Sequence, residues 1–345
     1  MSAKPSIPSV PEFEGIDRAR FESEIVPAGR PAILRGAVAH WPIVAAAHES
    51  PSTVADYLRE RATDEGDEAW FAEPEIRGRF GFNAEINGYN HDRRQATVGQ
   101  LLDLLLRQQG DPQPWGIYAG AMPLRRHAPR VLAENVMPFL APDRYMLISL
   151  WLGNRTRTAA HWDLPQNLAC VVAGRRRFTL FPTSEVADLY VGPLDFTLAG
   201  QPSSLADMEE PDFDRFPRLR NAFAAAEEAE LGPGDVLYMP SLWWHASQSE
   251  DELSALINYW WRDGPARTIT PQFSLMHALL TMRELPERER EAWRSLFNHY
   301  VFRDQGDPAE HLPEAARGIL GPQSAEQVAQ LKANLAEALR TRSLE

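Results

Sequence analysis

Residues 232–245 read Gly-Pro-Gly-Asp-Val-Leu-Tyr-Met-Pro-Ser-Leu-Trp-Trp-His, and this stretch indicates the kind of fold. A Gly-Pro-Gly turn comes before a short run rich in β-formers, and a proline ends that run. A second run then begins with two tryptophans and carries His245. The pattern predicts short strands joined by tight turns, with the imidazole of His245 on a late strand and facing the interior of the sheet structure.

Similar short runs precede and follow this stretch, with glycine, proline and asparagine between them. They predict strands at residues 145–152, 168–172, 176–181, 235–239 and 253–261. Many short strands with such turns are typical of an antiparallel jelly roll. The fold class expected is therefore mainly β with flanking helices, built on a double-stranded β-helix (cupin-like jelly roll) core with a helical region at its C-terminal side.

The periodicity also suggests how the chain is divided. Residues 1–114 read as a mixed α/β segment that packs on the core, with amphipathic helices at 52–61 and 97–106. Residues 115–264 read as the jelly roll, interrupted at 183–230 by a long acidic excursion that could face a substrate. Residues 265–345 read as helical, with apolar stripes that include Leu296 and Leu335. The stripes fit equally well with packing on the same subunit and with a dimer interface.

Composition narrows the function classes. The 35 Lys plus Arg and 48 Asp plus Glu give a net charge of −13, which argues against nucleic-acid binding by a general basic surface, although a local arginine patch keeps that class open. Cys170 is the single cysteine, so an intrachain disulfide and a cysteine-based metal site are excluded. No stretch approaches the roughly 20 apolar residues of a membrane span, and a cytoplasmic location is expected.

Three side chains suggest a metal site. In a strand, His161 and Asp163 would point to the same face, and a jelly roll can bring His245 beside them from a distant strand. Two imidazoles and one carboxylate occupy one face of an octahedral ion and leave three positions open, as in non-haem Fe(II) oxygenases. The alternatives are two polar residues on a surface strand and a histidine whose hydrogen bonds are satisfied within the core.

Arg176 is the second chemical signal. Strand alternation places it on the same face as Phe178 and Leu180, so it is buried if that face is the core face. A buried guanidinium must be paired. Its partner is either a bound dicarboxylate or an internal Asp or Glu, and Arg175 and Arg177 could add local positive potential.

Several stretches together resemble a known family: residues 158–163 (Thr-Ala-Ala-His-Trp-Asp), Gln166-Asn167, 174–182, 211–217, 232–245 and 258–260. The sequence from about residue 29 to 264 resembles the cupin-like branch of the JmjC oxygenases, and within it the asparaginyl hydroxylases. The resemblance implies Fe(II) and the cosubstrate 2-oxoglutarate. It implies these site residues: His161, Asp163 and His245 as iron ligands, Thr158, Tyr118 and Arg176 at the distal carboxylate of 2-oxoglutarate, and Asn167 and Asn258 beside the cosubstrate and metal.

One departure from the family is visible, because Arg176 stands where the family has a lysine, and a planar guanidinium is larger than an ammonium group. The resemblance implies a dioxygenase that hydroxylates a protein or peptide side chain while 2-oxoglutarate and O₂ become succinate and CO₂. Alternatives are an N-methyl demethylase, a cupin-type protein that binds a metal or small acid without turnover, and a nucleic-acid hydroxylase. A small-molecule substrate is also possible in principle. Relatives dimerise through C-terminal helices, which favours a homodimer. Trp162 should face away from the metal and has no catalytic role.

Overall fold

The computed structural model describes residues 4–141, 144–263 and 270–340. These divide into two compact units, one ending at Asp263 and one made by the residues after it. The boundary expected between residues 264 and 265 lies outside the described residues. Within the described part, no helix is both long enough and apolar enough to cross a membrane.

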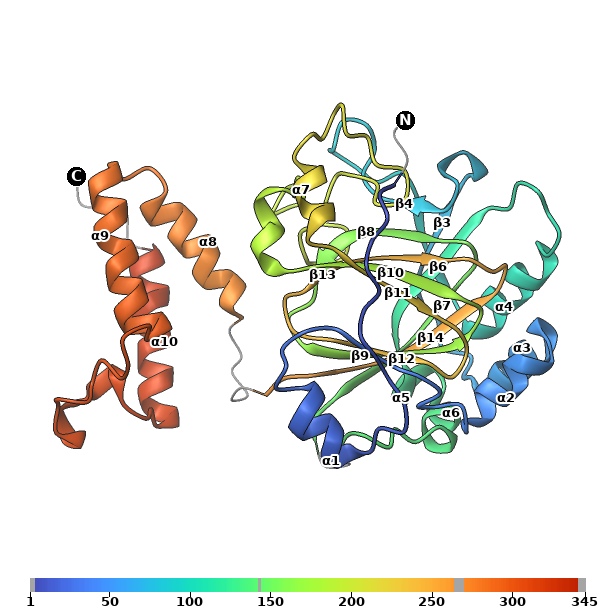
Figure 1. Ribbon diagram of the computed structural model, residues 1–345, viewed down its shortest axis with the longest axis horizontal. Coiled ribbons are helices and arrows are strands. Elements are labelled where there is room, and N and C mark those ends of the chain that lie inside the picture. Colours follow the sequence, from blue (N-terminus) through green and yellow to red (C-terminus); the bar gives the residue numbers. More distant parts are fainter. Residues whose placement is uncertain (1–3, 142–143, 264–269, 341–345) are drawn as a thin grey trace. The chain divides into compact units, whose positions relative to one another are not determined.

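Two β-sheets form the core of the first unit (Figure 1). The smaller sheet has five strands in the order β11 (Glu227–Leu231), β10 (Arg176–Phe181), β13 (Trp244–Ser249), β8 (Arg157–Trp162) and β4 (Arg79–Phe80). The larger sheet has nine strands in the order β1 (Glu12–Phe13), β2 (Ala32–Leu34), β12 (Val236–Met239), β9 (Gln166–Ala173), β14 (Ser254–Trp261), β7 (Leu147–Gly153), β6 (Gly116–Pro123), β3 (Asp67–Ala72) and β5 (Asp92–Ala96). The jelly-roll expectation is confirmed.

The two faces of the larger sheet explain its hydrophobic strands. Between the sheets, side chains such as Val171, Leu180 and Leu237 form one apolar cluster. On the opposite face, Cys170 and Ile257 pack against residues of the helices that cover the sheet. Strands covered on both faces read as continuous apolar runs, as 168–172 does.

The helices have these bounds: α1 (Arg18–Arg20), α2 (Pro42–Glu49), α3 (Pro51–Arg61), α4 (Val98–Arg107), α5 (Leu124–His127), α6 (Pro129–Glu134), α7 (Leu219–Ala224), α8 (Pro271–Met282), α9 (Glu287–Phe297) and α10 (Ala325–Arg340). The helices expected at residues 52–61 and 97–106 are present as α3 and α4. Ser50 caps α3, and Thr97 forms a capping box with Gln100 on α4. Ser324 and Gln327 exchange the same pair of hydrogen bonds before α10.

The N-terminal third is part of the larger sheet, because it supplies β1, β2, β3 and β5. The acidic excursion leaves the small sheet after β10 and returns to it at Glu227, where β11 begins. Between these points, Ser204 donates its backbone N–H to Ala160 of β8, so the excursion passes beside the strand that carries His161.

Candidate metal centre

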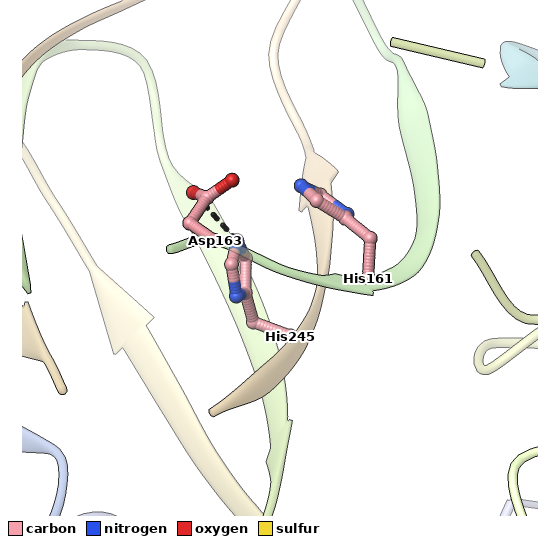
Figure 2. Close-up of side chains that lie close together, drawn as sticks. All are labelled: His161, Asp163 and His245. Carbon is pink, nitrogen blue, oxygen red and sulfur yellow. Dashed lines mark ion pairs between the residues drawn. The ribbon is translucent and has the colours of Figure 1, made fainter. Parts of the chain in front are cut away.

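The three predicted metal ligands meet at one point (Figure 2). Strands β8 and β13 are antiparallel neighbours, and their register places His161 directly opposite His245. Asp163 lies one residue beyond the end of β8 rather than within the strand as expected. Its backbone carbonyl accepts a hydrogen bond from Leu242 N–H at 2.9 Å, which fixes the turn. One ligand atom from each of the three side chains lies within 4.8 Å of the others.

Hydrogen bonds fix which imidazole nitrogen is available to a metal. The Nδ1–H of His161 donates to the carbonyl of Ala159 at 2.9 Å, and that of His245 donates to Trp243 at 3.1 Å. A carbonyl can only accept, so each ring carries its proton on Nδ1 and its lone pair on Nε2. Burial, followed by the nearby His161 ring, lowers the pKa of His245 to about 4. The ring of His245 is therefore neutral near pH 7.

The donor set fits a ferrous ion. Asp163 and His245 are buried, and their Oδ2 and Nε2 atoms are 3.6 Å apart, too far for a hydrogen bond (dashed line in Figure 2). Within the described ranges, the group that could hold a metal contains these three side chains and no fourth His, Cys, Asp or Glu. Two imidazole nitrogens and one carboxylate, without a fourth ligand from the protein, suit an ion with open coordination positions.

A cavity beside the three ligands, here called the inner cavity, brings together every site residue that the sequence predicted. Its lining includes Tyr118, Thr158, His161, Asp163, Asn167, Arg176, His245 and Asn258. Each of these except Asp163 lies on a strand. The structure thus brings all eight side chains to one cavity, and their roles in binding stay a prediction.

Arg176 is buried in the inner cavity, with 4% of its surface exposed. One guanidinium nitrogen, Nη2, donates to Ser254 Oγ at 3.1 Å, whereas Nε has no hydrogen-bond partner among the described residues. Among the residues the structure describes, no carboxylate forms an ion pair with it, so the internal Asp or Glu considered as an alternative partner is not found there. Burial lowers the pKa of Arg176. An uncompensated buried guanidinium costs several kcal/mol, by an order-of-magnitude estimate, unless an anion pairs with it.

Other polar atoms of the inner cavity are also unpaired. Asn167 Oδ1 and Asn258 Nδ2 are buried without a hydrogen-bond partner in the described part of the chain. Trp151 Nε1 donates to Asn258 Oδ1 at 2.7 Å and so fixes that amide. Thr158 Oγ1 lies 3.0 Å from Ser247 Oγ. Burial raises the pKa of Tyr118, so its hydroxyl keeps its proton and can donate it to an anion. The cavity thus offers a ligand both unpaired donors, such as Asn258 Nδ2, and an unpaired acceptor, Asn167 Oδ1.

The neighbouring arginines do not contribute as expected. Arg175 lies near Glu250 and Asp251, and Arg177 pairs with Glu209 and Glu250. These ion pairs neutralise both side chains, so the prediction that all three arginines supply positive potential is wrong for Arg175 and Arg177. Arg176 alone faces the cavity, because alternation along β10 turns its two neighbours the other way.

A second cavity of about 310 Å³, here called the outer cavity, also has the metal-ligand candidates His161 and Asp163 in its lining. It shares with the inner cavity the residues Tyr118, Trp151, Thr158, His161, Asp163 and Trp260. Leu198, Gln201 and Ser203 of its wall lie in the excursion that the sequence analysis expected to face a substrate. Sequence reasoning missed another part of the wall, which includes Asp67, Glu68, Trp70 and Arg93. The strand-like run at 67–72 was the available signal, but nothing in that run shows where the strand lies.

A jelly roll that carries two imidazoles and one carboxylate beside a polar cavity is the architecture of the cupin class, with a candidate metal site. Comparison with known proteins agrees: the family described as "Cupin-like domain" matches residues 18–267. The chain belongs to this cupin-like family, which includes JmjC-domain relatives.

Three relatives illustrate the likeness. Lysine-specific demethylase JMJ31 of Arabidopsis thaliana is 26% identical over 286 residues, covering 74% of this chain and 50% of the relative. Jumonji C domain-containing protein 5 of Drosophila melanogaster is 26% identical, covering 73% and 59% respectively. tRNA wybutosine-synthesizing protein 5 of Gallus gallus is 31% identical, covering 38% and 43%. The chain thus spans less than two thirds of each relative. None of the three is named an asparaginyl hydroxylase, so the likeness to that subgroup stays a prediction.

Among solved structures, the X-ray structure of E. coli ycfD aligns with a TM-score of 0.43 at 13% identity, covering 95% of this chain and 69% of that chain.

Proposed function

We propose that this protein is an Fe(II)- and 2-oxoglutarate-dependent dioxygenase that hydroxylates a side chain of a protein or peptide. The observation that carries the proposal is Arg176, a buried guanidinium without a carboxylate partner in the described chain, in a cavity that also contains the three metal-ligand candidates. A dicarboxylate that spanned the cavity would pair with Arg176 through one carboxylate and bind the metal through its other end.

The residues have separate tasks in this proposal. His161, His245 and Asp163 would hold the ferrous ion. Arg176 would bind the distal carboxylate of 2-oxoglutarate through charge-assisted hydrogen bonds, with Tyr118 and Thr158 as further donors. Asn167 and Asn258 would pair their free amide atoms with the cosubstrate or with metal-bound groups. The role of each of these residues stays a prediction from the sequence and the geometry.

When bound, ferrous iron and 2-oxoglutarate supply the oxidising chemistry: O₂ converts the cosubstrate to succinate and CO₂, and one oxygen atom goes to a C–H bond of the substrate. The protein orients the cosubstrate and excludes water. Apolar side chains of the inner cavity, such as Phe178, Met239 and Leu256, limit the space for water around the carboxylate. Arg176 supplies the local positive charge that a protein of net charge −13 needs to bind a dianion.

In this proposal the outer cavity receives the substrate side chain, because His161 and Asp163 line it and Arg176 does not. A nucleic-acid substrate receives less support. Two members of the arginine patch that kept this class open, Arg126 and Arg130, lie in ion pairs with Glu65 and Glu134, and the net charge is negative.

Demethylation is the second candidate, and a specific observation favours it: two relatives carry the name lysine-specific demethylase. The same chemistry applied to an N-methyl group would release formaldehyde. Detection of formaldehyde from methylated peptides, without a stable product heavier by one oxygen atom, would show that the activity is demethylation and not hydroxylation.

Succinate formation tests the proposed function. Purified protein with Fe(II), ascorbate, O₂ and 2-oxoglutarate should form succinate above the level of a His245→Ala control, even slowly and without substrate. Equal succinate in both proteins, together with binding of 2-oxoglutarate, would indicate the non-catalytic cupin-type protein instead. Mass spectrometry of the host proteome with and without the active protein would then identify the substrate by its added oxygen.

We also propose a homodimer formed through the C-terminal helices. Helices α8, α9 and α10 contain no buried residue within the described chain, although Trp293, Leu296 and Leu339 are large and apolar. Such a face needs a partner surface. Light scattering should give a dimer mass for the parent protein and a smaller mass for Leu335→Arg or Leu296→Arg. A monomer mass in the parent would refute the proposal.

A further inference from the structure

One wall of the outer cavity is a loop of the acidic excursion. Residues 193–202 form this loop. Its two ends are joined by a backbone hydrogen bond, in which Gly192 N–H donates to the carbonyl of Ser203 at 2.8 Å. Ser203 also forms a β-bridge with His161, so this end of the loop is fixed to the strand that carries a metal-ligand candidate. Leu198, Ala199 and Gln201 extend along the cavity. In the described part of the chain, no backbone–backbone hydrogen bond holds residues 193–202 themselves.

Side chains of the N-terminal third hold the far end of this loop instead. Arg93 Nη2 donates to the carbonyl of Leu198 at 2.6 Å, and Tyr89 Oη–H donates to the carbonyl of Thr197 at 2.9 Å. The ring of Phe196 stacks on the ring of Tyr89, with centroids 5.3 Å apart. Two consecutive carbonyls of the loop are therefore bound by two side chains that lie far away in sequence.

The guanidinium of Arg93 is itself fixed. It lies 4.2 Å from the centroid of the Tyr89 ring and 4.9 Å from that of Trp70, and Nη1 donates to Glu68 at 3.3 Å. The ion pair with Glu68 contributes little, because the Glu68 side chain is 47% exposed. The charge-assisted bond to a carbonyl is stronger, and the stacked planar group loses little freedom when it forms. A lysine could not reproduce this arrangement.

We infer that Arg93 is a positioning residue that holds residues 196–203 in place as the substrate-facing wall of the outer cavity. The assignment of this cavity to the substrate rests on the proposed function, whereas the attachment of the loop by Arg93 does not. Without Arg93 the loop should open more often, because its far end then keeps only the bond from Tyr89 to Thr197 and the packing of Phe196 on Tyr89 and Phe82 among the contacts described. The inner cavity should keep its affinity for 2-oxoglutarate, because Arg93 is not among its lining residues.

A cysteine reporter measures opening directly. Cys170 is fully buried, so Ser203→Cys adds a single buried thiol, with 3% of the surface of this residue exposed, at the fixed end of the loop and on the wall of the outer cavity; we expect a reagent to reach it when the far part of the loop moves away. Adding Arg93→Gln should increase the labelling rate by an aromatic maleimide roughly tenfold, since labelling of a closed site follows the population of the open form. Arg94→Gln is the matched control: its guanidinium pairs with Asp92 and approaches Phe71, away from the loop. It should leave the rate unchanged.

Two further variants separate the parts of the attachment. Tyr89→Phe keeps the stacked ring and loses the hydroxyl donor, so it should give a smaller increase than Arg93→Gln. Arg93→Lys keeps the charge and loses the planar fork, so it should label nearly as fast as Arg93→Gln. Labelling rates of Arg93→Gln and Arg93→Lys within twofold of the parent would overturn the inference.

Turnover distinguishes this inference from the proposed function. With Fe(II) and 2-oxoglutarate, Arg93→Gln should bind the cosubstrate within about twofold of the parent, because Arg93 does not line the inner cavity. A tenfold loss of 2-oxoglutarate affinity in Arg93→Gln would contradict the separation of the two cavities. If the parent makes no succinate, the proposed function fails while the labelling result still decides whether Arg93 holds the loop.

Discussion

The inner and outer cavities meet at His161 and Asp163 and are built in different ways. The inner cavity is lined by strands of both sheets, and buried polar atoms such as Arg176 Nε and Asn258 Nδ2 have no protein partner. In the outer cavity, part of the wall is a loop, and its charged groups already pair with one another, as Glu68 does with Arg93. The inner cavity thus has polar atoms already positioned for one ligand, whereas the outer cavity can change its shape when the loop moves.

The largest expected effect comes from the residues that the cavities share. His161→Ala should lower the affinity for a divalent metal by at least about a hundredfold, because even changes behind a ligand cost 10 to 100-fold. Anaerobic calorimetry with Fe(II), or aerobic calorimetry with Ni(II), measures this. Trp162→Phe is the control, since that side chain packs into the apolar cluster on the other face. Unchanged metal binding in His161→Ala would contradict the assignment of a metal site where the two cavities meet.

Arg176→Met tests the inner cavity and should have two effects of opposite sign. The affinity for 2-oxoglutarate should fall by about a hundredfold, as expected when a buried charge pair is broken. The ligand-free protein should keep its free energy of unfolding or gain about 1 kcal/mol in urea denaturation, because an unpaired buried charge has been removed.

Arg177→Met is its matched control from the adjacent position. It should leave 2-oxoglutarate binding intact and lose about 1 kcal/mol of stability, since it breaks the partly buried ion pairs with Glu209 and Glu250. A loss of stability in Arg176→Met, with 2-oxoglutarate binding retained, would mean that the guanidinium has a structural role.

The sequence predicted the two cavities unequally, for physical reasons. Residues of the inner cavity occupy inward strand positions, where alternation and burial limit the choice of side chain, so His161, Arg176 and Asn258 could be placed from pattern and resemblance. The wall of the outer cavity comes from β3, β5 and the excursion, which meet through side-chain contacts between distant segments. Nothing local in residues 67–72 indicates that Trp70 will face Arg93 and the metal.

Trp70→Leu tests whether the cavities are independent. The ring of Trp70 contacts Arg93, His91 and Tyr118 on the outer side. Its replacement should change the dissociation constant of 2-oxoglutarate by less than about twofold, because the side chain does not line the inner cavity. The same calorimetric titration measures it, and a tenfold weakening would show that the two cavities act as one.

The smallest effect concerns pH and the outer wall. Burial, and then the charge of Arg93, lowers the pKa of His91 to about 4. Between pH 6.5 and 4 the unfolded chain takes up a proton at this residue and the folded protein does not, so the free energy of unfolding falls as the pH falls. Solvent screening keeps the slope below the one-proton limit of about 1.4 kcal/mol per pH unit. In His91→Gln this contribution should vanish, and an unchanged acid slope would contradict the assignment.

Anaerobic titration of the protein with Fe(II) and 2-oxoglutarate, followed by visible absorption, tests the central claim most directly. The account predicts a weak charge-transfer band that saturates at one equivalent of each in the parent protein. The band should be absent in His161→Ala and should require far more 2-oxoglutarate in Arg176→Met. No band in the intact protein, or a band that is unaffected by either substitution, would contradict the account.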